Sequence, residues 1–212
     1  IYYDDLPLGE VVKGNATKNE TWLNTTDTFL AQTTDYDNFG LPIRQTNPRG
    51  FSTTLEYDAA HLYPITATNA LGHATHTVLD LGIGQALENT DANGLQTKQT
   101  YDGVGRPLKM EISDPKNPGS LVVTKTFEFN DASMPRASKQ VAHNDDGQTL
   151  ESVAYADGLG RTIETKQEAS NGKWVTAETI FDERGNVKKS IQPFFANAST
   201  FESVDGNKVG TT

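Results

Sequence analysis

Acidic side chains are the first candidates for chemistry in this sequence, which contains 28 Asp and Glu residues. Two carboxylates at a suitable separation can serve as the acid and the base of a glycoside hydrolase. Most of the Asp residues, however, occupy positions that favour turns. Glu56, Glu111 and Glu164 lie in expected strands, and we interpret them as solvated strand residues. We therefore expect no catalytic residues and no enzymatic activity.

Metal binding is the second chemistry to consider. Residues 89–94 mimic the start of a calcium loop, but Thr100 stands where the bidentate Glu would be. A hairpin turn explains Asp91 and Gly94 as well, and a weak calcium site stays open as an alternative. His73 and His76 are three residues apart, which places them on opposite faces of a strand. We expect no metal ion and no cofactor.

Aromatic side chains could bind carbohydrate, because sugars stack on exposed rings. Trp22 and Trp174 are candidates, together with several regularly spaced tyrosines. The alternative is that Tyr36, Tyr57 and Tyr101 pack as a structural ladder at equivalent positions of a repeat. Their regular spacing favours the ladder over a single ligand site.

Composition excludes several classes of protein. The net charge of −10 disfavours nucleic acid and anionic membranes as partners, since both attract positive proteins. No apolar run is long enough to cross a membrane. The absence of Cys rules out disulfides and zinc–sulfur sites. With 35% hydrophobic residues the chain can build only a thin core, and its start at Ile1 suggests an excerpt of a longer polypeptide.

The positioning elements are expected to be hairpin turns. Seven tetrads have Asp or Asn first and Gly fourth: 37–40, 47–50, 69–72, 91–94, 102–105, 157–160 and 182–185. An Asp or Asn side chain in such a turn accepts hydrogen bonds from backbone N–H groups two residues on. The glycine then adopts the positive φ that closes a short hairpin loop.

An aromatic residue often precedes the tetrad, and the spacing is regular. Tyr36 and Tyr57 are 21 residues apart, and Gly50, Gly72 and Gly94 are spaced by 22. The repeat-turn positions that we expect to be structural are Tyr36, Asp37, Gly40, Gly50, Tyr57, Asp58, Gly72, Asp91, Gly94, Tyr101, Asp102, Gly105, Tyr155, Asp157, Gly160, Phe181, Asp182 and Gly185.

Short alternating segments between these turns predict β-strands, with examples at 51–57, 121–129 and 174–181. No long window has helical periodicity. The predicted fold is all-β, built from repeated antiparallel hairpins. We expect an irregular lead-in with possible strands at 1–34, a hairpin array at 35–195, and a tail or connection at 196–212.

The repeat resembles the YD, or Rhs, repeat family. Residues 36–42 (Tyr-Asp-Asn-Phe-Gly-Leu-Pro) and 101–107 (Tyr-Asp-Gly-Val-Gly-Arg-Pro) are similar to family repeats with little change. Residues 68–73, 155–161 and 192–195 resemble the middle region of the B component of bacterial insecticidal Tc toxin complexes and of SpvB-type toxins. The resemblance covers about residues 33 to 195.

This resemblance implies a spiralling sheet that forms a hollow shell around a toxic polypeptide. It implies a non-catalytic structural segment of a secreted virulence toxin. The expected partners are other YD-repeat segments of the same assembly and the enclosed polypeptide, without nucleic acid and without direct membrane insertion. A free-standing carbohydrate-binding or surface-binding module, similar to an adhesin, is the alternative.

Overall fold

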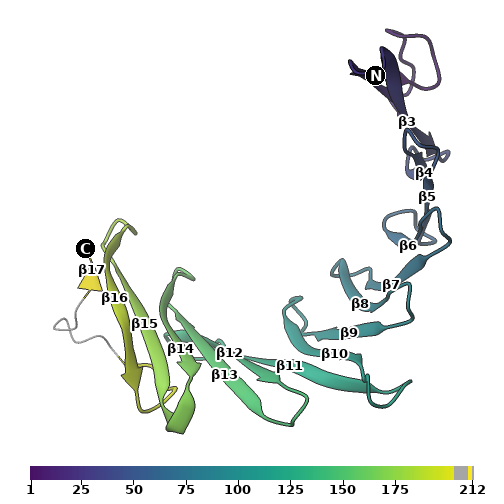
Figure 1. Cartoon of the computed structure of the whole chain (residues 1–212). Coiled ribbons are helices and arrows are strands. Elements are labelled where there is room, and N and C mark those ends of the chain that lie inside the picture. The colour runs from purple at the N-terminus through teal and green to yellow at the C-terminus, as the bar shows by residue number, and fades with distance from the viewer. Residues whose placement is uncertain (203–209, 212) are drawn as a thin grey trace. The chain divides into compact units, whose positions relative to one another are not determined.

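A computed structural model describes residues 1–202, 210 and 211. The chain divides into two compact units, Ile1–Lys98 and Gln99–Thr212, and strand β9 (Gln96–Tyr101) contains the boundary. Figure 1 shows that hairpins follow one another within each unit. Among the described residues, no helix is long and apolar enough to cross a membrane.

The first unit is a series of antiparallel strands in which each strand pairs with the next. The strands are β1 (Tyr2–Tyr3), β2 (Ala16–Leu23), β3 (Thr28–Tyr36), β4 (Pro42–Thr46), β5 (Ser52–Tyr57), β6 (Pro64–Thr68), β7 (Ala74–Asp80), β8 (Gln85–Thr90) and β9. In this unit Thr17 alone among the described residues is fully buried, so neighbouring strands and turns rather than a core support the sheet.

The second unit repeats this arrangement with longer strands. They are β10 (Pro107–Ser113), β11 (Leu121–Asn130), β12 (Arg136–His143), β13 (Thr149–Ala156), β14 (Thr162–Glu168), β15 (Trp174–Phe181), β16 (Val187–Ala196) and β17 (Gly210–Thr211). A single 3-10 turn, Ser170–Gly172, is the only helical element of the described residues. The predicted all-β fold of antiparallel hairpins is confirmed.

The turns show why Asp or Asn and Gly recur. In the turn between β15 and β16, Asp182 Oδ1 accepts hydrogen bonds from the N–H groups of Arg184 (2.9 Å) and Asn186 (2.8 Å). Gly185 has a φ of 87° and donates its N–H to the Asp182 carbonyl at 3.0 Å. The same bonding occurs at Asp37, Asn47, Asn69, Asp91, Asp102 and Asp157.

An eighth turn has this structure although it was not predicted. Residues 144–147 read Asn-Asp-Asp-Gly, and Asn144 Oδ1 accepts hydrogen bonds from the N–H groups of Asp146 and Gln148. Gly147 has a φ of 76°. This sequence matches the tetrad pattern of Asn first and Gly fourth, so the pattern alone was sufficient to predict the turn. Unlike several of the other tetrads, it is not preceded by Tyr or Phe.

Contacts between successive hairpins use the residues beside the turns. Tyr57 donates its hydroxyl hydrogen to the carbonyl of Pro42 at 3.0 Å, which joins the β5–β6 hairpin to its predecessor. In the second unit, Arg161 bonds Asp157 Oδ2 through Nε at 2.7 Å and lies 4.4 Å above the ring of Phe181. Arg161 therefore links the turn that precedes β14 to the end of β15.

We expect the glycine at the fourth position of the tetrad to be required because of its positive φ and not because a side chain would clash. A Cβ atom at Gly160 or at Gly158 would have no neighbour within 4 Å, but only Gly160 has a positive φ, of 79°. Gly160→Ala should lower the free energy of unfolding by about 1–2 kcal/mol because an L-residue is strained there. The matched control Gly158→Ala should leave stability unchanged or slightly higher. Urea unfolding followed by circular dichroism measures both; equal effects would contradict the role assigned to φ.

The Arg161 link should not tolerate lysine. Arg161→Lys keeps the positive charge but loses the paired contacts of Nε and Nη2 with Asp157 Oδ2. It also loses the planar guanidinium that lies over the ring of Phe181. We expect a loss of about 1 kcal/mol in the free energy of unfolding. Arg184→Lys, at an exposed turn position, is the control and should have little effect. Thermal unfolding of the two variants would disprove the link if their midpoints were the same.

Candidate functional site

Strand register in the second unit separates side chains into two faces with different chemistry. One row across strands β11 to β15 is Phe127, Gln140, Ser152, Gln167 and Val175, and a parallel row is Phe129, Ser138, Ala154, Thr165 and Ala177. The opposite face carries Lys139, Val153, Lys166 and Thr176 between these rows.

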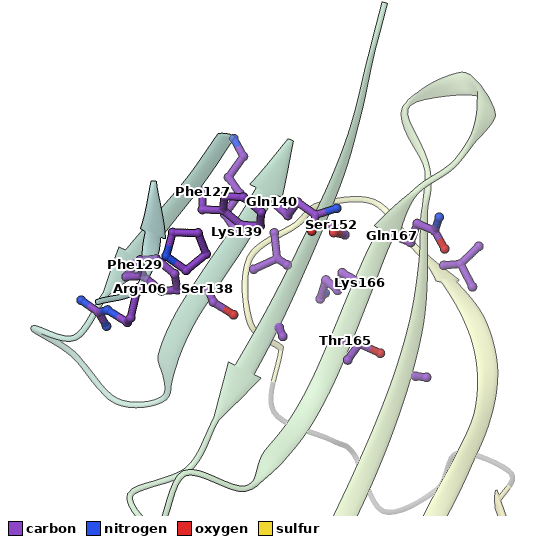
Figure 2. Close-up of a pocket in the computed structure, with 15 residues that line it drawn as sticks. Arg106, Phe127, Phe129, Ser138, Lys139, Gln140, Ser152, Thr165, Lys166 and Gln167 are labelled. Atoms are coloured by element: carbon purple, nitrogen blue, oxygen red, sulfur yellow. The ribbon is translucent and has the colours of Figure 1, made fainter. Parts of the chain in front are cut away.

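The first face forms a hollow of about 820 Å³. Its lining consists of the two rows, of Arg106 and Pro107, and of three residues that lie between the rows along the strands, Lys139, Val153 and Lys166. Figure 2 shows Phe127 and Phe129 at one end of the hollow and Gln167 toward the other. Hydroxyl and amide side chains lie between these ends, among apolar residues such as Val175 and Ala177.

Arg106 closes the phenylalanine end of the hollow. Its Nε and Nη1 atoms bond Asp102 Oδ2 and Asp131 Oδ2, both at 2.7 Å, and the guanidinium lies 4.2 Å above the ring of Phe129. Hydrogen bonds from the Arg106 backbone N–H, and then from its side chain, lower the pKa of Asp102. The positive charge of Arg106 is therefore held by two carboxylates.

The hollow is suited to hydrogen bonding. No carboxylate or imidazole is found among its described lining residues. Serine and threonine hydroxyls without a neighbouring base are poor nucleophiles. The side chains of Gln140, Ser152 and Gln167 offer donors and acceptors to a polar or extended ligand.

The opposite face contains a buried charged cluster. Glu164 on β14 stands opposite Glu178 on β15, and Lys166 lies two residues further along β14. The three residues are only 1%, 2% and 1% exposed, respectively. Our expectation that Glu164 is a solvated strand residue was wrong. Of the other two residues, Glu56 is exposed and Glu111 is half-buried.

Burial changes the ionisation of Glu164. Removal from water raises the pKa of this carboxyl to about 7, the charge of Glu178 adds to the increase, and Lys166 opposes it. The Lys166 Nζ atom lies 3.6 Å from Glu164 Oε1, which is an ion pair longer than a hydrogen bond. Two carboxyl groups and one amine are thus buried together, with little exposure to solvent.

A segment from the C-terminal side covers this cluster. Residues 197–201, which we call the strap, follow β16 and run back over β15 and β14 to β13. Lys166 Nζ donates to the Ala198 carbonyl at 3.2 Å, and Tyr155 donates its hydroxyl hydrogen to the Ser199 carbonyl at 2.7 Å. Glu164 and the side-chain rows of the hollow lie on opposite faces of the sheet.

The repeat positions expected from the sequence do not converge on one site. Tyr36, Tyr57 and Tyr101 place their hydroxyl groups on Ala16 O, Pro42 O and Gln99 Oε1, at 3.2, 3.0 and 2.7 Å. The aspartates bond backbone N–H groups of their own turns. The corresponding glycines Gly40, Gly50, Gly72, Gly94, Gly105, Gly160 and Gly185 all have positive φ. Asp58 serves a longer turn and accepts from Ala60, Leu62 and Tyr63.

The residues weighed for metal binding are also separate from both faces. Asp91 Oδ1 accepts the N–H groups of Asn93 and Leu95, as in the other turns. His76 lies on β7 with Nδ1 at 3.3 Å from the Thr66 hydroxyl. In the part of the chain that the structure describes, no three His, Cys, Asp or Glu side chains group as metal ligands.

Comparison with known proteins agrees with this architecture. The model of the RHS Repeat family matches residues 36–74. No curated protein is similar enough in sequence to count as a match.

Solved structures of Tc toxins have a similar fold. A crystal structure of TcdB2-TccC3 matches with a TM-score of 0.66 and 19% identity over 85% of this chain. A crystal structure of TcdB2-TccC3-Cdc42 gives 0.64 and 16% over 85%, and the Photorhabdus luminescens Tc holotoxin pore gives 0.50 and 14% over 84%. The chain spans 12%, 14% and 11% of the lengths of those chains. Residues 36–74 thus match the RHS Repeat family, and the fold of the chain resembles that of these Tc toxin structures.

Proposed function

We propose that this chain is a non-catalytic segment of a YD-repeat wall that encloses the toxic polypeptide of a large secreted bacterial toxin. The observation that carries the proposal is that the sheet is sustained without a substantial apolar core. In the described residues only Val153, Ile191 and Ala196 are buried hydrophobic side chains. Hairpins that depend on their neighbours can be added to one another without limit, which is what a wall requires.

The hollow of the second unit supports the same role. A wall around an unfolded polypeptide must contact it without binding it tightly. Rows of Ser, Thr and Gln side chains offer hydrogen bonds comparable to those of water, and the two phenylalanine rings of the hollow lie together at one end (Figure 2). The net charge of −10 adds repulsion toward acidic polypeptides.

The partners in this proposal are further YD-repeat segments and the enclosed polypeptide. Similarity to structures of TcdB2-TccC3 and of a Tc holotoxin pore supports assembly with other toxin components. Secretion of the assembly follows from the same likeness. The boundaries 1–34, 35–195 and 196–212 stay a prediction for the lead-in, the repeat array and the connection, and residues 203–209 and 212 lie outside the described residues.

Protection of the enclosed polypeptide from protease tests the proposal. The native polypeptide that carries this chain, together with its toxic segment, is treated with protease and the fragments are identified by mass. We expect the toxic segment to survive in the native particle. Combined Gly105→Val and Gly160→Val changes should open the wall and expose it, because both positions have positive φ.

The control is the pair Gly103→Val and Gly158→Val in the same two turns, where added side chains meet no neighbour. It should leave protection intact. Rapid cleavage of the toxic segment in the unmodified particle would contradict enclosure, as would equal resistance of the isolated segment.

An exposed aromatic pair favours carbohydrate or surface binding as a second candidate. Trp22 and Phe29 face each other across β2 and β3, with ring centroids 4.8 Å apart. They are 47% and 59% exposed, although burial of such rings is normally favourable. Exposed aromatic rings are typical of sugar-binding surfaces.

A glycan array with the native protein distinguishes this candidate. If Trp22 and Phe29 form a sugar site, Trp22→Ala should weaken binding of the recognised glycan at least tenfold. Phe39→Ala removes a more exposed ring (70%) from a hairpin turn and should not affect glycan binding. An array without signal would contradict carbohydrate binding, and the structural role would be the remaining candidate.

A further inference from the structure

The loop that joins β1 to β2 is held in place by one carboxylate. Asp4 Oδ2 accepts hydrogen bonds from the backbone N–H groups of Val12 (2.8 Å), Lys13 (2.7 Å) and Gly14 (3.0 Å). Its Oδ1 atom accepts the N–H group of Asn15 at 3.0 Å. These bonds, the one from Gly14 above all, lower the pKa of Asp4 to about 2. The carboxylate therefore stays ionised above that pH and fixes the conformation of the loop.

The same loop, residues 4–15, presents apolar side chains to solvent, and we call it the Asp4 loop. Leu8, Val11 and Val12 are 68%, 57% and 78% exposed within a stretch of five residues. Apolar side chains gathered in this way favour contact with another apolar surface. Because the loop is already fixed, little conformational entropy is lost when it docks on a partner.

A hollow at the edge of the first unit has matching properties. Its volume is about 420 Å³, and its lining includes Phe51 and Leu71, which are 56% and 76% exposed, beside the amides of Gln32 and Gln45. We call it the turn hollow, since Phe51 and Leu71 belong to the turns that follow β4 and β6. None of its described lining residues is charged.

The Asp4 loop and the turn hollow lie at opposite ends of the strands. Turns alternate between the two margins of a sheet in which each strand pairs with the next, antiparallel one. The Asp4 loop lines a depression together with Asp37 and Asn38 of the turn after β3, whereas the turn hollow adjoins the turns after β4 and β6. A five-residue strand such as β4 separates the margins by roughly 17 Å. The fixed loop therefore does not reach the hollow of its own chain.

Charges at the two surfaces are complementary. Residues 4–15 contain three acidic residues and one lysine, whereas the turns 47–51 and 69–73 contain an arginine, a histidine and no acidic residue. Glu10 of the Asp4 loop and Arg49 beside the turn hollow are both exposed. Across the part of the chain that the structure describes, neither side chain forms an ion pair. Both are available to a partner of opposite charge.

We propose that the Asp4 loop of one copy of this chain docks in the turn hollow of a second copy. The three exposed aliphatic side chains of the loop cover Phe51 and Leu71, and Glu10 pairs with Arg49. Each added copy brings one further free loop and one further free hollow, so the contact is head-to-tail and extends in an open series. This self-association does not depend on enclosure of a polypeptide or on a glycan site.

Sedimentation of the chain over a range of concentrations tests the contact. We expect the average mass to rise with concentration and to pass that of a dimer, because a head-to-tail contact does not close. Glu10→Arg and Arg49→Glu should each raise the dissociation constant at least tenfold. The variant that carries both changes should recover to within threefold of the wild type, because the pair is restored with its charges exchanged.

Matched variants separate the contact from general effects of charge and apolar area. Glu56→Arg makes the same charge reversal at an exposed position of β5 on the face opposite to Thr53, and should leave association unchanged. Val12→Ser should weaken association at least fivefold. Val104→Ser removes an equally exposed valine (77%) from a turn of the second unit and should have no effect. Circular dichroism verifies that each variant is folded.

Three results would overturn the proposal. The first is the mass of a single chain at every concentration. The second is association that the single charge reversals do not weaken or that the double reversal does not restore. The third is an equal loss of association in Val12→Ser and Val104→Ser, which would indicate nonspecific apolar contact. Because the double reversal contains both single changes, its recovery also shows that neither change acts by unfolding the chain.

Discussion

The hydrogen bonding of one Asp or Asn side chain within eight of the hairpin turns is the interaction on which this structure depends. A single oxygen accepts two backbone N–H groups, two and four residues further on, and a glycine with positive φ completes the turn. Each turn therefore fixes the register of its two strands locally. The first unit has almost no buried side chains to do so, and the repeated turns explain how a sheet with so little apolar burial keeps a defined strand order.

The local nature of the turns also explains which features the sequence predicts. Asp182 and Gly185 form their turn with residues no more than four positions away, so the tetrad contains the necessary information. Glu164 is different. It lies beside Lys166, which bonds the Ala198 carbonyl 32 residues away along the chain, and no local pattern reports such a contact. The hollow could not be predicted from the sequence either. Its lining depends on the register of five strands, and a shift of one residue in a strand moves its side chains to the other face.

The two faces of the second unit show how one alternating pattern produces different chemistry. Ser152 and Gln167 stand on the open face and remain available for hydrogen bonds. Lys166, one residue earlier, points to the opposite face, where the strap covers it. The proposed wall role would use an open face that carries hydrogen-bonding groups, and would need some means of protecting a sheet face that lacks a second layer. In this unit the strap supplies the second.

Carboxylates whose pKa values shift in opposite directions affect the pH range in which the folded second unit is favoured. Backbone and arginine hydrogen bonds lower the pKa of turn aspartates such as Asp157 and Asp182, so their contribution is present above about pH 3.8 and is lost as the pH falls through their folded pKa. Glu164 contributes in the reverse sense, because its raised pKa of about 7 favours the folded state at low pH and ceases to do so above that value. Both contributions are therefore fully present only between about pH 3.8 and 4.5, and that of Glu164 declines as the pH rises to about 7. Acid below this range weakens turns that recur along the sheet, whereas the effect of Glu164 is confined to one buried position of the second unit.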